Sequence, residues 1–180
     1  MVSQAAAAGV AGVWSEETAA FRRVLGRFAS GVALIDTVHQ GRRASMAVNS
    51  FAPVSLEPPL VLFCARKAST SWAAIRAAGA FSVSFLTAEQ IAVSSAFAKK
   101  LPERYELAAW TRLASGRYRL SDCVGWLDCG IEQVVDAGDH EVCIARADES
   151  GLGAEDHEPV VFYAGKYWKD MQRAARGGRA

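Results

Sequence analysis

The segment from Ser45 to Ala65, SMAVNSFAPVSLEPPLVLFCA, constrains the fold more than any other stretch of the chain. Three short β-type runs follow one another in it. They are separated by a bend at Asn49–Ser50 and by Pro58 and Pro59, which cannot donate ladder hydrogen bonds. Parallel strands would need long crossover connections between them, and there is no room for these here. The segment therefore predicts antiparallel hairpins, and we interpret it as the floor of a binding site.

Similar runs occur along the rest of the chain. Branched and aromatic residues predict further strands at 32–37, from Arg42, and at 81–86, 126–135, 140–147 and 160–163, and the apolar run 60–65 predicts a central strand. Apolar residues at helical spacing predict a first helix that ends at Gly31, and a second helix is expected over 72–78 with Gly79 as its stop. Thr87 and Gln90 have the spacing of a capping box, which predicts a helix over 88–98. Residues 101–125 are expected to be mostly loop, with room for a short helix, and to be anchored by Trp110.

These elements predict a mainly β chain, an antiparallel barrel with added helices. Its 180 residues fit one domain, which we place at 17–170, with disordered segments at 1–16 and 171–180. The net charge of +1 gives no reason to expect nucleic acid as a partner. The chain has no basic leader and no apolar run long enough to span a membrane, so a cytoplasmic protein is expected.

Cysteines and histidines do not form a metal-binding pattern. The cysteines at 64, 123, 129 and 143 have neither zinc-site spacing nor the arrangement of a disulfide framework, and they are expected to be buried free thiols. The three histidines lie far apart in the sequence. No metal site is expected.

Two short segments could bind a ligand. Asn49 and Ser50 end a strand with side chains that can donate and accept hydrogen bonds to a planar ligand, although an Asx-type turn would use the same residues. Ser69, Thr70 and Ser71 precede a helix and follow Arg66 and Lys67, a pattern that suits a phosphate as well as an ordinary helix cap. His140 opens a strand after Asp139, where it could meet a ligand or simply lie on the surface.

Several motifs together resemble the short-chain flavin reductases. They are FRRVLGRFASGV, SMAVNSFAPVSLEPPLVLFCARKASTSW, AGAFSVSFLTAEQ, FAKK, AGDH and FYAGKYW, in the same order from Phe21 to Trp168. The resemblance implies a split antiparallel β-barrel of the FMN-binding type, Greek-key-like, that forms a homodimer with a flavin near the subunit interface. It also implies an NAD(P)H:flavin oxidoreductase that supplies reduced flavin to a separate monooxygenase.

The resemblance also implies the site residues. The isoalloxazine and ribityl region would be lined by Ser45, Met46, Ala47, Asn49 and Ser50. The ribityl chain and phosphate would meet Cys64, Ala65, Arg66, Ser69, Thr70 and Ser71, and the flavin site would be completed by Ser55, Phe97, Ala98 and Lys100. His140 and Tyr167 would flank the nicotinamide, with His140 as the residue nearest to the chemistry.

FAD is expected to be preferred over FMN. NADH is expected to be preferred over NADPH, since no clamp for a 2′-phosphate can be identified. The cofactor carries the hydride chemistry, so no obligate general base is predicted. Two alternatives use the same barrel. One is a flavin-binding carrier or sensor without significant turnover. The other is a relative of pyridoxamine-phosphate oxidases or haem-handling proteins, which would leave AGDH and GKY unexplained.

Overall fold

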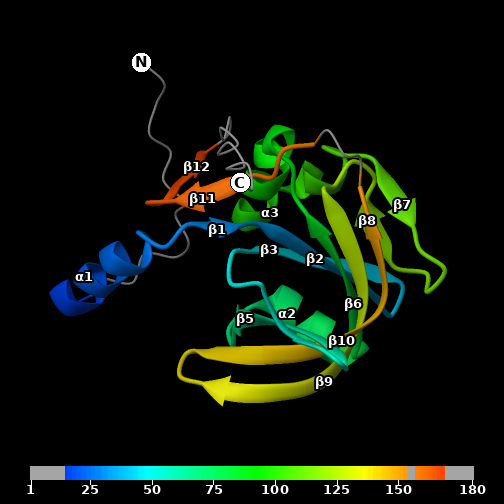
Figure 1. Cartoon of the computed structure of the whole chain (residues 1–180), viewed down its shortest axis with the longest axis horizontal. Helices are drawn as coiled ribbons and strands as arrows, with labels where there is room; N and C mark the ends of the chain where they lie inside the picture. The colour runs from blue at the N-terminus through cyan, green and yellow to red at the C-terminus, as the bar shows by residue number, and fades with distance from the viewer. Residues whose placement is uncertain (1–14, 154–156, 169–180) are drawn as a thin grey trace, which may run out of the picture.

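A curved antiparallel sheet with helices packed on its faces forms the body of the protein, seen in a computed structural model (Figure 1). The structure describes residues 15–153 and 157–168. The expected disordered segments fall outside these ranges, except that Ser15 and Glu16 cap and begin the first helix. The elements in chain order are α1 Glu16–Leu25, β1 Ser30–Gly31, β2 Ala33–His39, β3 Arg42–Val48, β4 Ala52–Leu56, β5 Pro59–Arg66, α2 Thr70–Ala78, β6 Ala80–Phe85, η1 Ala88–Gln90, α3 Ile91–Lys99, η2 Pro102–Tyr105, β7 Trp110–Arg112, β8 Tyr118–Leu120, β9 Gly125–Ala137, β10 His140–Leu152, β11 Val161–Tyr163 and β12 Lys166–Trp168.

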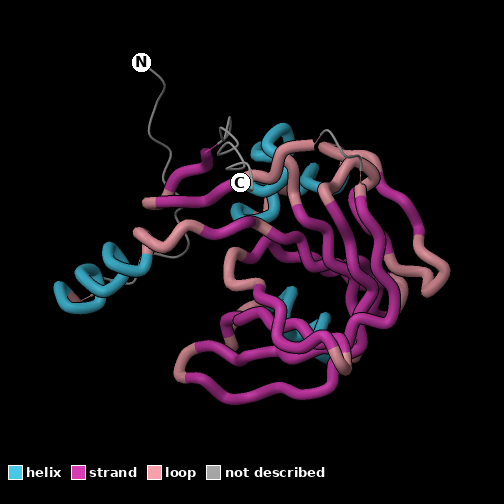
Figure 2. The backbone as a smooth tube through the Cα atoms, in the orientation of Figure 1, coloured by secondary structure: helices cyan, strands magenta, loops and turns pink. Residues whose placement is uncertain are grey.

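The main sheet has seven strands in the order β3-β2-β6-β9-β10-β5-β4, and all its pairs are antiparallel. The sheet curls into a barrel-like shape (Figure 2), but its edge strands β3 and β4 do not pair with each other. A split β-barrel leaves this kind of gap. The mainly β fold with added helices is therefore confirmed.

Strand β2 shows why this sheet carries helices on both faces. Its first five residues are buried, so Ala33 and Ile35 pack in one cluster while Leu34, between them, packs in another with Val32, which directly precedes the strand. Such alternation follows from the two-residue period of a strand. The first cluster includes Trp72 of α2 and the second lies against α3, and together these clusters hold both helices on the sheet.

Two sequence predictions for the elements are wrong. The first helix ends at Gly26 and not at Gly31, because the chain turns there to let Gly31 pair with Val161 in a small sheet of β1, β11 and β12. The run 60–65 lies one strand from the edge, since β4 covers its outer side. Residues 101–125 are mostly loop with the short helix η2, as expected, but they also contain the β7–β8 hairpin, whose rings pack around Arg43 and which was not predicted.

Other local predictions are confirmed. Ser69 caps α2 and Gly79 ends it in the left-handed conformation. Thr87 and Gln90 form the capping box, although it opens a short 3-10 helix that continues into α3. Buried free thiols are found at Cys123, Cys129 and Cys143, while Cys64 is only partly buried.

Candidate functional site

The N-terminus of α2 lies beside the C-terminus of α3. The side chain of Ser69 accepts a hydrogen bond from the backbone N–H of Trp72 at 3.2 Å. The first-turn N–H groups of Thr70 and Ser71 have no acceptor within the helix. Lys100 reaches the same end of α2, and its Nζ donates to Thr70 Oγ1 at 3.2 Å. A cation, a hydroxyl and helix N–H groups therefore converge, and this donor set suits a phosphate.

The backbone of Lys100 is what aims this side chain. Lys100 caps α3 in the left-handed conformation, with φ 55° and ψ 40°, which is uncommon for a residue with a Cβ. Its backbone N–H still bonds to the helix at Phe97. The chain turns away from α3 at this point, so the side chain of Lys100, at the end of α3, reaches the beginning of α2.

The bend after β3 is tied to the end of β5. Ser50 Oγ accepts a hydrogen bond from the Cys64 N–H at 2.9 Å and donates one to the Cys64 carbonyl at 3.1 Å. The predicted residues Asn49 and Ser50 are thus beside Cys64, which leads through Ala65 and Arg66 to the α2 cap. Because both bonds of the Ser50 hydroxyl go to the backbone, Ser50 shapes this part of the site, while Asn49 is exposed.

Strand β3 divides the remaining predicted flavin residues between its two faces. Ala47 packs on the α3 side, whereas Met46 packs against the first core cluster, with Trp72. Ser45 is buried and donates to Asp36 Oδ2 at 2.6 Å, and its oxygen lies 3.0 Å from the Tyr105 hydroxyl. Only one face of β3 can line any single ligand, so Met46 could contribute through its backbone alone.

A role for Asp36 was not predicted from the sequence, although its carboxylate holds the side chain of Ser45 in place. Its Oδ2 also accepts from Arg43 Nη2 at 2.8 Å, and the Arg43 guanidinium lies 3.8 Å from the centre of the Trp110 ring. Burial raises the pKa of the Asp36 carboxyl, and Arg43 and the Ser45 hydrogen bond partly oppose this effect. An acidic residue within an apolar β run was the only sequence signal for this network.

The side chains of several predicted residues contribute little to the site. Ala65 and Phe97 are buried in the two core clusters, and the Phe97 ring packs edge-on against Tyr105 at 5.2 Å. Ala98 is exposed beside them. Ser55 pairs with Leu60 at the other end of β5, about 13 Å along the strand from Cys64, so the structure does not bring it to this group.

His140 lies directly opposite Arg66 in the β10–β5 pair, which places it near the α2 cap. Its Nδ1 is 2.7 Å from Asp139 Oδ1, and this hydrogen bond holds the pKa of the Asp139 carboxyl below its ordinary value. The Asp139 carbonyl also accepts from the Lys67 N–H at 3.1 Å, joining the hairpin to the loop before α2. His140 is thereby held beside the segment that carries Ser69.

Tyr167 lies elsewhere in the chain. Its hydroxyl is 2.9 Å from Ser94 Oγ of α3, and its ring packs against Phe162. The tip of the β9–β10 hairpin and the β11–β12 hairpin lie at opposite sides of the molecule in Figure 1. One chain therefore does not bring His140 and Tyr167 together.

A further polar group next to the site was missed. Glu141, the neighbour of His140, accepts from Trp72 Nε1 at 2.6 Å and from Arg76 at 2.7 Å. These bonds attach α2 to β10. Trp72 and Glu141 lie 69 residues apart in the sequence, so no local pattern reveals the contact. Among residues 15–153 and 157–168, no cluster of His, Cys, Asp or Glu could hold a metal ion, and no helix is long and apolar enough to cross a membrane.

Known proteins are similar to this chain in sequence and in fold. The reductase subunit HsaB of a flavin-dependent monooxygenase from Rhodococcus jostii is 41% identical over 147 residues, which cover 82% of this chain and 75% of that protein. The structure of nitrilotriacetate monooxygenase component B from Mycobacterium thermoresistibile is similar with a TM-score of 0.80 and 35% identity, covering 89% of this chain and 94% of the other. The Streptomyces globisporus NADH:FAD oxidoreductase SgcE6, in complex with NAD and FAD fragments, has a TM-score of 0.82 at 28% identity, covering 88% and 96%. Residues 25–169 match the flavin reductase like domain, and the chain belongs to this family.

Proposed function

We propose that this protein is an NAD(P)H-dependent flavin reductase that supplies reduced flavin to a separate monooxygenase. The observation that carries the proposal is the convergence of Lys100, Thr70 and the α2 N-terminus, at the end of the strand whose Cys64 is bonded to Ser50. It offers donors for a phosphate and a polar bend for a flavin ring within one connected region. The relatives named as reductase components of monooxygenases support the same function.

In this proposal the phosphate of the flavin lies at Thr70 and Ser71, with Lys100 as its cation. The ribityl chain follows the backbone from Cys64 to Arg66, and the ring lies along the face of β3 that carries Ala47. Small side chains on that face allow the backbone to approach the ring closely. The bound flavin supplies the chemistry by accepting a hydride from the nicotinamide, and the protein positions the two rings.

His140 is the proposed contact for the nicotinamide. Asp139, when ionised, can only accept a hydrogen bond, so the proton of the neutral imidazole sits on Nδ1. Nε2 is then left as an acceptor. The imidazole is partly exposed, with 35% of its side-chain surface accessible, and a second ligand could reach it.

A homodimer would complete the site. The apolar face of α1 and Phe28, three residues beyond its end, are uncovered in the single chain, with Phe21, Val24, Leu25 and Phe28 between 55% and 81% exposed. Such a patch is typical of an interaction surface. Since His140 and Tyr167 lie apart in one chain, a second copy would be the source of one of them at each nicotinamide.

We favour FAD and NADH as the substrates, as the relative named an NADH:FAD oxidoreductase uses both. FMN and NADPH are the alternatives. Because NADH is produced by intracellular metabolism, we place the reaction in the cytoplasm, where a reduced-flavin-dependent monooxygenase would receive the product.

Stopped-flow mixing of the protein with NADH and free flavin tests the function. Flavin absorbance should bleach much faster than in a protein-free control, and repeating the run with FAD, FMN, NADH and NADPH ranks the substrates. A protein that binds flavin without faster bleaching would be a carrier or sensor. That outcome would refute the proposed reductase activity.

A further inference from the structure

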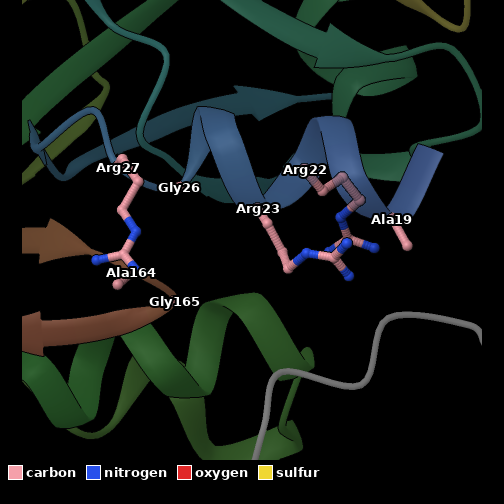
Figure 3. Close-up of a pocket in the computed structure, with 7 residues that line it drawn as sticks. All are labelled: Ala19, Arg22, Arg23, Gly26, Arg27, Ala164 and Gly165. Atoms are coloured by element: carbon pink, nitrogen blue, oxygen red, sulfur yellow. The ribbon is translucent and has the colours of Figure 1, made fainter. Parts of the chain in front are cut away.

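Buried polar groups indicate a specific contact more strongly than charges at the surface do. The cavity of about 490 Å³ between α1 and the β11–β12 turn is lined by arginine side chains (Figure 3). These side chains are exposed, and no described residue of the lining has a buried polar group. A buried polar network lies instead on β2 and β3, where Asp36 is 1% and Ser45 is 5% exposed. This network ends at Tyr105, a residue not yet assigned to the flavin.

The hydrogen bonds of this network have a fixed direction. Arg43 donates to Asp36 Oδ2 from Nη2 at 2.8 Å and from Nε at 3.2 Å, and an ionised carboxylate can only accept. Ser45 therefore gives its one hydroxyl proton to Asp36, at 2.6 Å. The Ser45 and Tyr105 hydroxyl oxygens lie 3.0 Å apart, so Tyr105 is the donor in this second bond. The Tyr105 oxygen is thereby left as an acceptor for any other group.

The phenol ring of Tyr105 is held firmly in place. It packs edge-on against Phe97 at 5.2 Å, and the guanidinium groups of Arg43 and Arg104 lie 4.6 and 4.8 Å from its centre. Its backbone carbonyl accepts from Trp110 Nε1 at 2.8 Å. Within the described part of the chain, the Tyr105 hydroxyl makes no hydrogen bond besides the one to Ser45. Its oxygen is therefore a preorganised acceptor that the chain itself does not use.

Tyr105 borders the place where the flavin ring is proposed to lie. Ser45 and Ala47 are two residues apart on β3, so they share the face of the strand that the ring follows. The Tyr105 hydroxyl contacts Ser45, and its ring contacts Phe97, another residue of the proposed flavin site. Ser45 lies about 7 Å along the strand beyond Ala47, on the side away from the bend at Ser50. Tyr105 is therefore at the side of the ring site that is remote from this bend.

The two ends of an isoalloxazine ring differ in chemistry. The dimethylbenzene end is apolar, and against hydroxyl groups it would leave them without partners, which is costly in a buried place. The pyrimidine end carries two carbonyls and the N3–H donor, which needs an acceptor. We infer that Tyr105 recognises the flavin by accepting a hydrogen bond from N3–H, with Asp36 and Ser45 fixing the direction of the Tyr105 proton. This contact rests on the proposed function, which places the ring on this face of β3.

Fluorescence titration with FMN and with 3-methyl-FMN tests this contact, because methylation removes the N3 proton and leaves the phosphate unchanged. The wild type should bind FMN about tenfold more tightly than 3-methyl-FMN. Tyr105→Phe removes the acceptor, so it should weaken FMN binding by about fivefold and leave 3-methyl-FMN nearly unchanged. Tyr118→Phe is the matched control, since its ring also lies by Arg43, at 4.7 Å, and both affinities should stay the same.

Ser45→Ala tests the direction of the Tyr105 proton. Without the Ser45 oxygen this proton loses its acceptor, so the Tyr105 hydroxyl can turn. The preference for FMN over 3-methyl-FMN should then fall by about twofold, less than in Tyr105→Phe. Thermal unfolding of each variant verifies folding. Should Tyr105→Phe fail to fold, an unchanged preference in Ser45→Ala overturns the contact.

Several outcomes would overturn the contact. One is an equal preference for FMN in the wild type and Tyr105→Phe, and another is an equal loss in Tyr118→Phe. Tighter binding of 3-methyl-FMN to Tyr105→Phe, with FMN unchanged, would show that Tyr105 only limits space.

Bleaching of FMN by NADH, measured separately, distinguishes this contact from the proposed reductase activity. Bleaching without the expected change in preference leaves the reductase activity in place and overturns the Tyr105 contact alone. The expected change in preference without bleaching supports the contact in a flavin carrier. A wild type that does not bind FMN would overturn both.

Discussion

The Nδ1 atom of His140 lies 2.7 Å from Oδ1 of Asp139, so the turn of the β9–β10 hairpin orients the first side chain of β10. The hydrogen bond connects two adjacent residues, and the Asp139 carbonyl holds the loop before α2. The orientation of the imidazole therefore depends on the same turn that fixes the entrance to the α2 cap.

Replacing His140 with Ala should raise the Michaelis constant for NADH by about tenfold, since a positioned hydrogen bond to the nicotinamide would be lost. Asp139→Asn should have a smaller effect in the same direction, because it loosens the ring without removing it. Steady-state kinetics at saturating flavin measure both, and flavin binding should change little. Glu149→Gln, exposed on β10, is the control. An unchanged Michaelis constant for NADH in His140→Ala would refute the role of His140 as a nicotinamide contact.

Lys100→Gln should weaken the binding of flavins that carry phosphate, because it removes the cation at the α2 N-terminus. We expect a loss of about tenfold for FMN and little change for riboflavin, which lacks the phosphate. Fluorescence titration of the flavin measures both affinities. Lys99→Gln, one residue earlier in α3, tests for a general charge effect. Equal losses for FMN and riboflavin would argue against a phosphate at this end of α2.

Ser69→Ala should lower the free energy of unfolding by about 1 kcal/mol, as the helix loses its side-chain cap. Urea denaturation measures this change. Ser15→Ala is the matched variant at the cap of α1, a helix that buries none of its residues in the single chain. The free energy of unfolding should therefore fall less in Ser15→Ala than in Ser69→Ala. A larger loss at Ser15 would mean that α1 contributes to the cooperative core.

Asp36→Asn should change how stability depends on pH. Burial raises the pKa of the Asp36 carboxyl above its ordinary value of 3.8, so the folded protein holds a proton where the unfolded chain has released it. Between these two pKa values the contribution of Asp36 to stability falls as the pH rises. The free energy of unfolding of the variant should therefore rise relative to the wild type across this window.

Urea denaturation at several pH values measures that difference. Asp122→Asn, at an exposed position, is the control and should follow the wild type. A difference between Asp36→Asn and the wild type that is constant with pH would show that the carboxyl does not titrate differently on folding.

The local features of this fold were predictable from the sequence. The strand period in β2 and β3, the cap at Ser69 and the capping box at Thr87 depend on neighbouring residues, and all are found. The β7–β8 hairpin was not predicted because its rings pack around Arg43, a residue from a distant strand. Gly26 ends α1 because of the turn at Ala164, which is equally remote in sequence.

The site was predictable in part for the same reason. The α2 cap could be inferred from Ser69, Thr70 and Ser71, whereas the arrival of Lys100 depends on how two helices pack. The network of Asp36 and Ser45 depends on strand register, which the sequence alone did not define. Short-range patterns therefore predicted the parts of the site, and tertiary packing determined how they meet.

The burial of the cysteine thiols protects them from a by-product of the chemistry proposed here. Reduced flavin that meets dioxygen before it reaches an oxygenase produces hydrogen peroxide, which oxidises cysteine in its thiolate form. Cys129 and Cys143 lie in the sheet interior, where burial raises the pKa of each thiol to about 12. They stay protonated at neutral pH. The core of the protein is thereby resistant to the oxidant that its own product can generate.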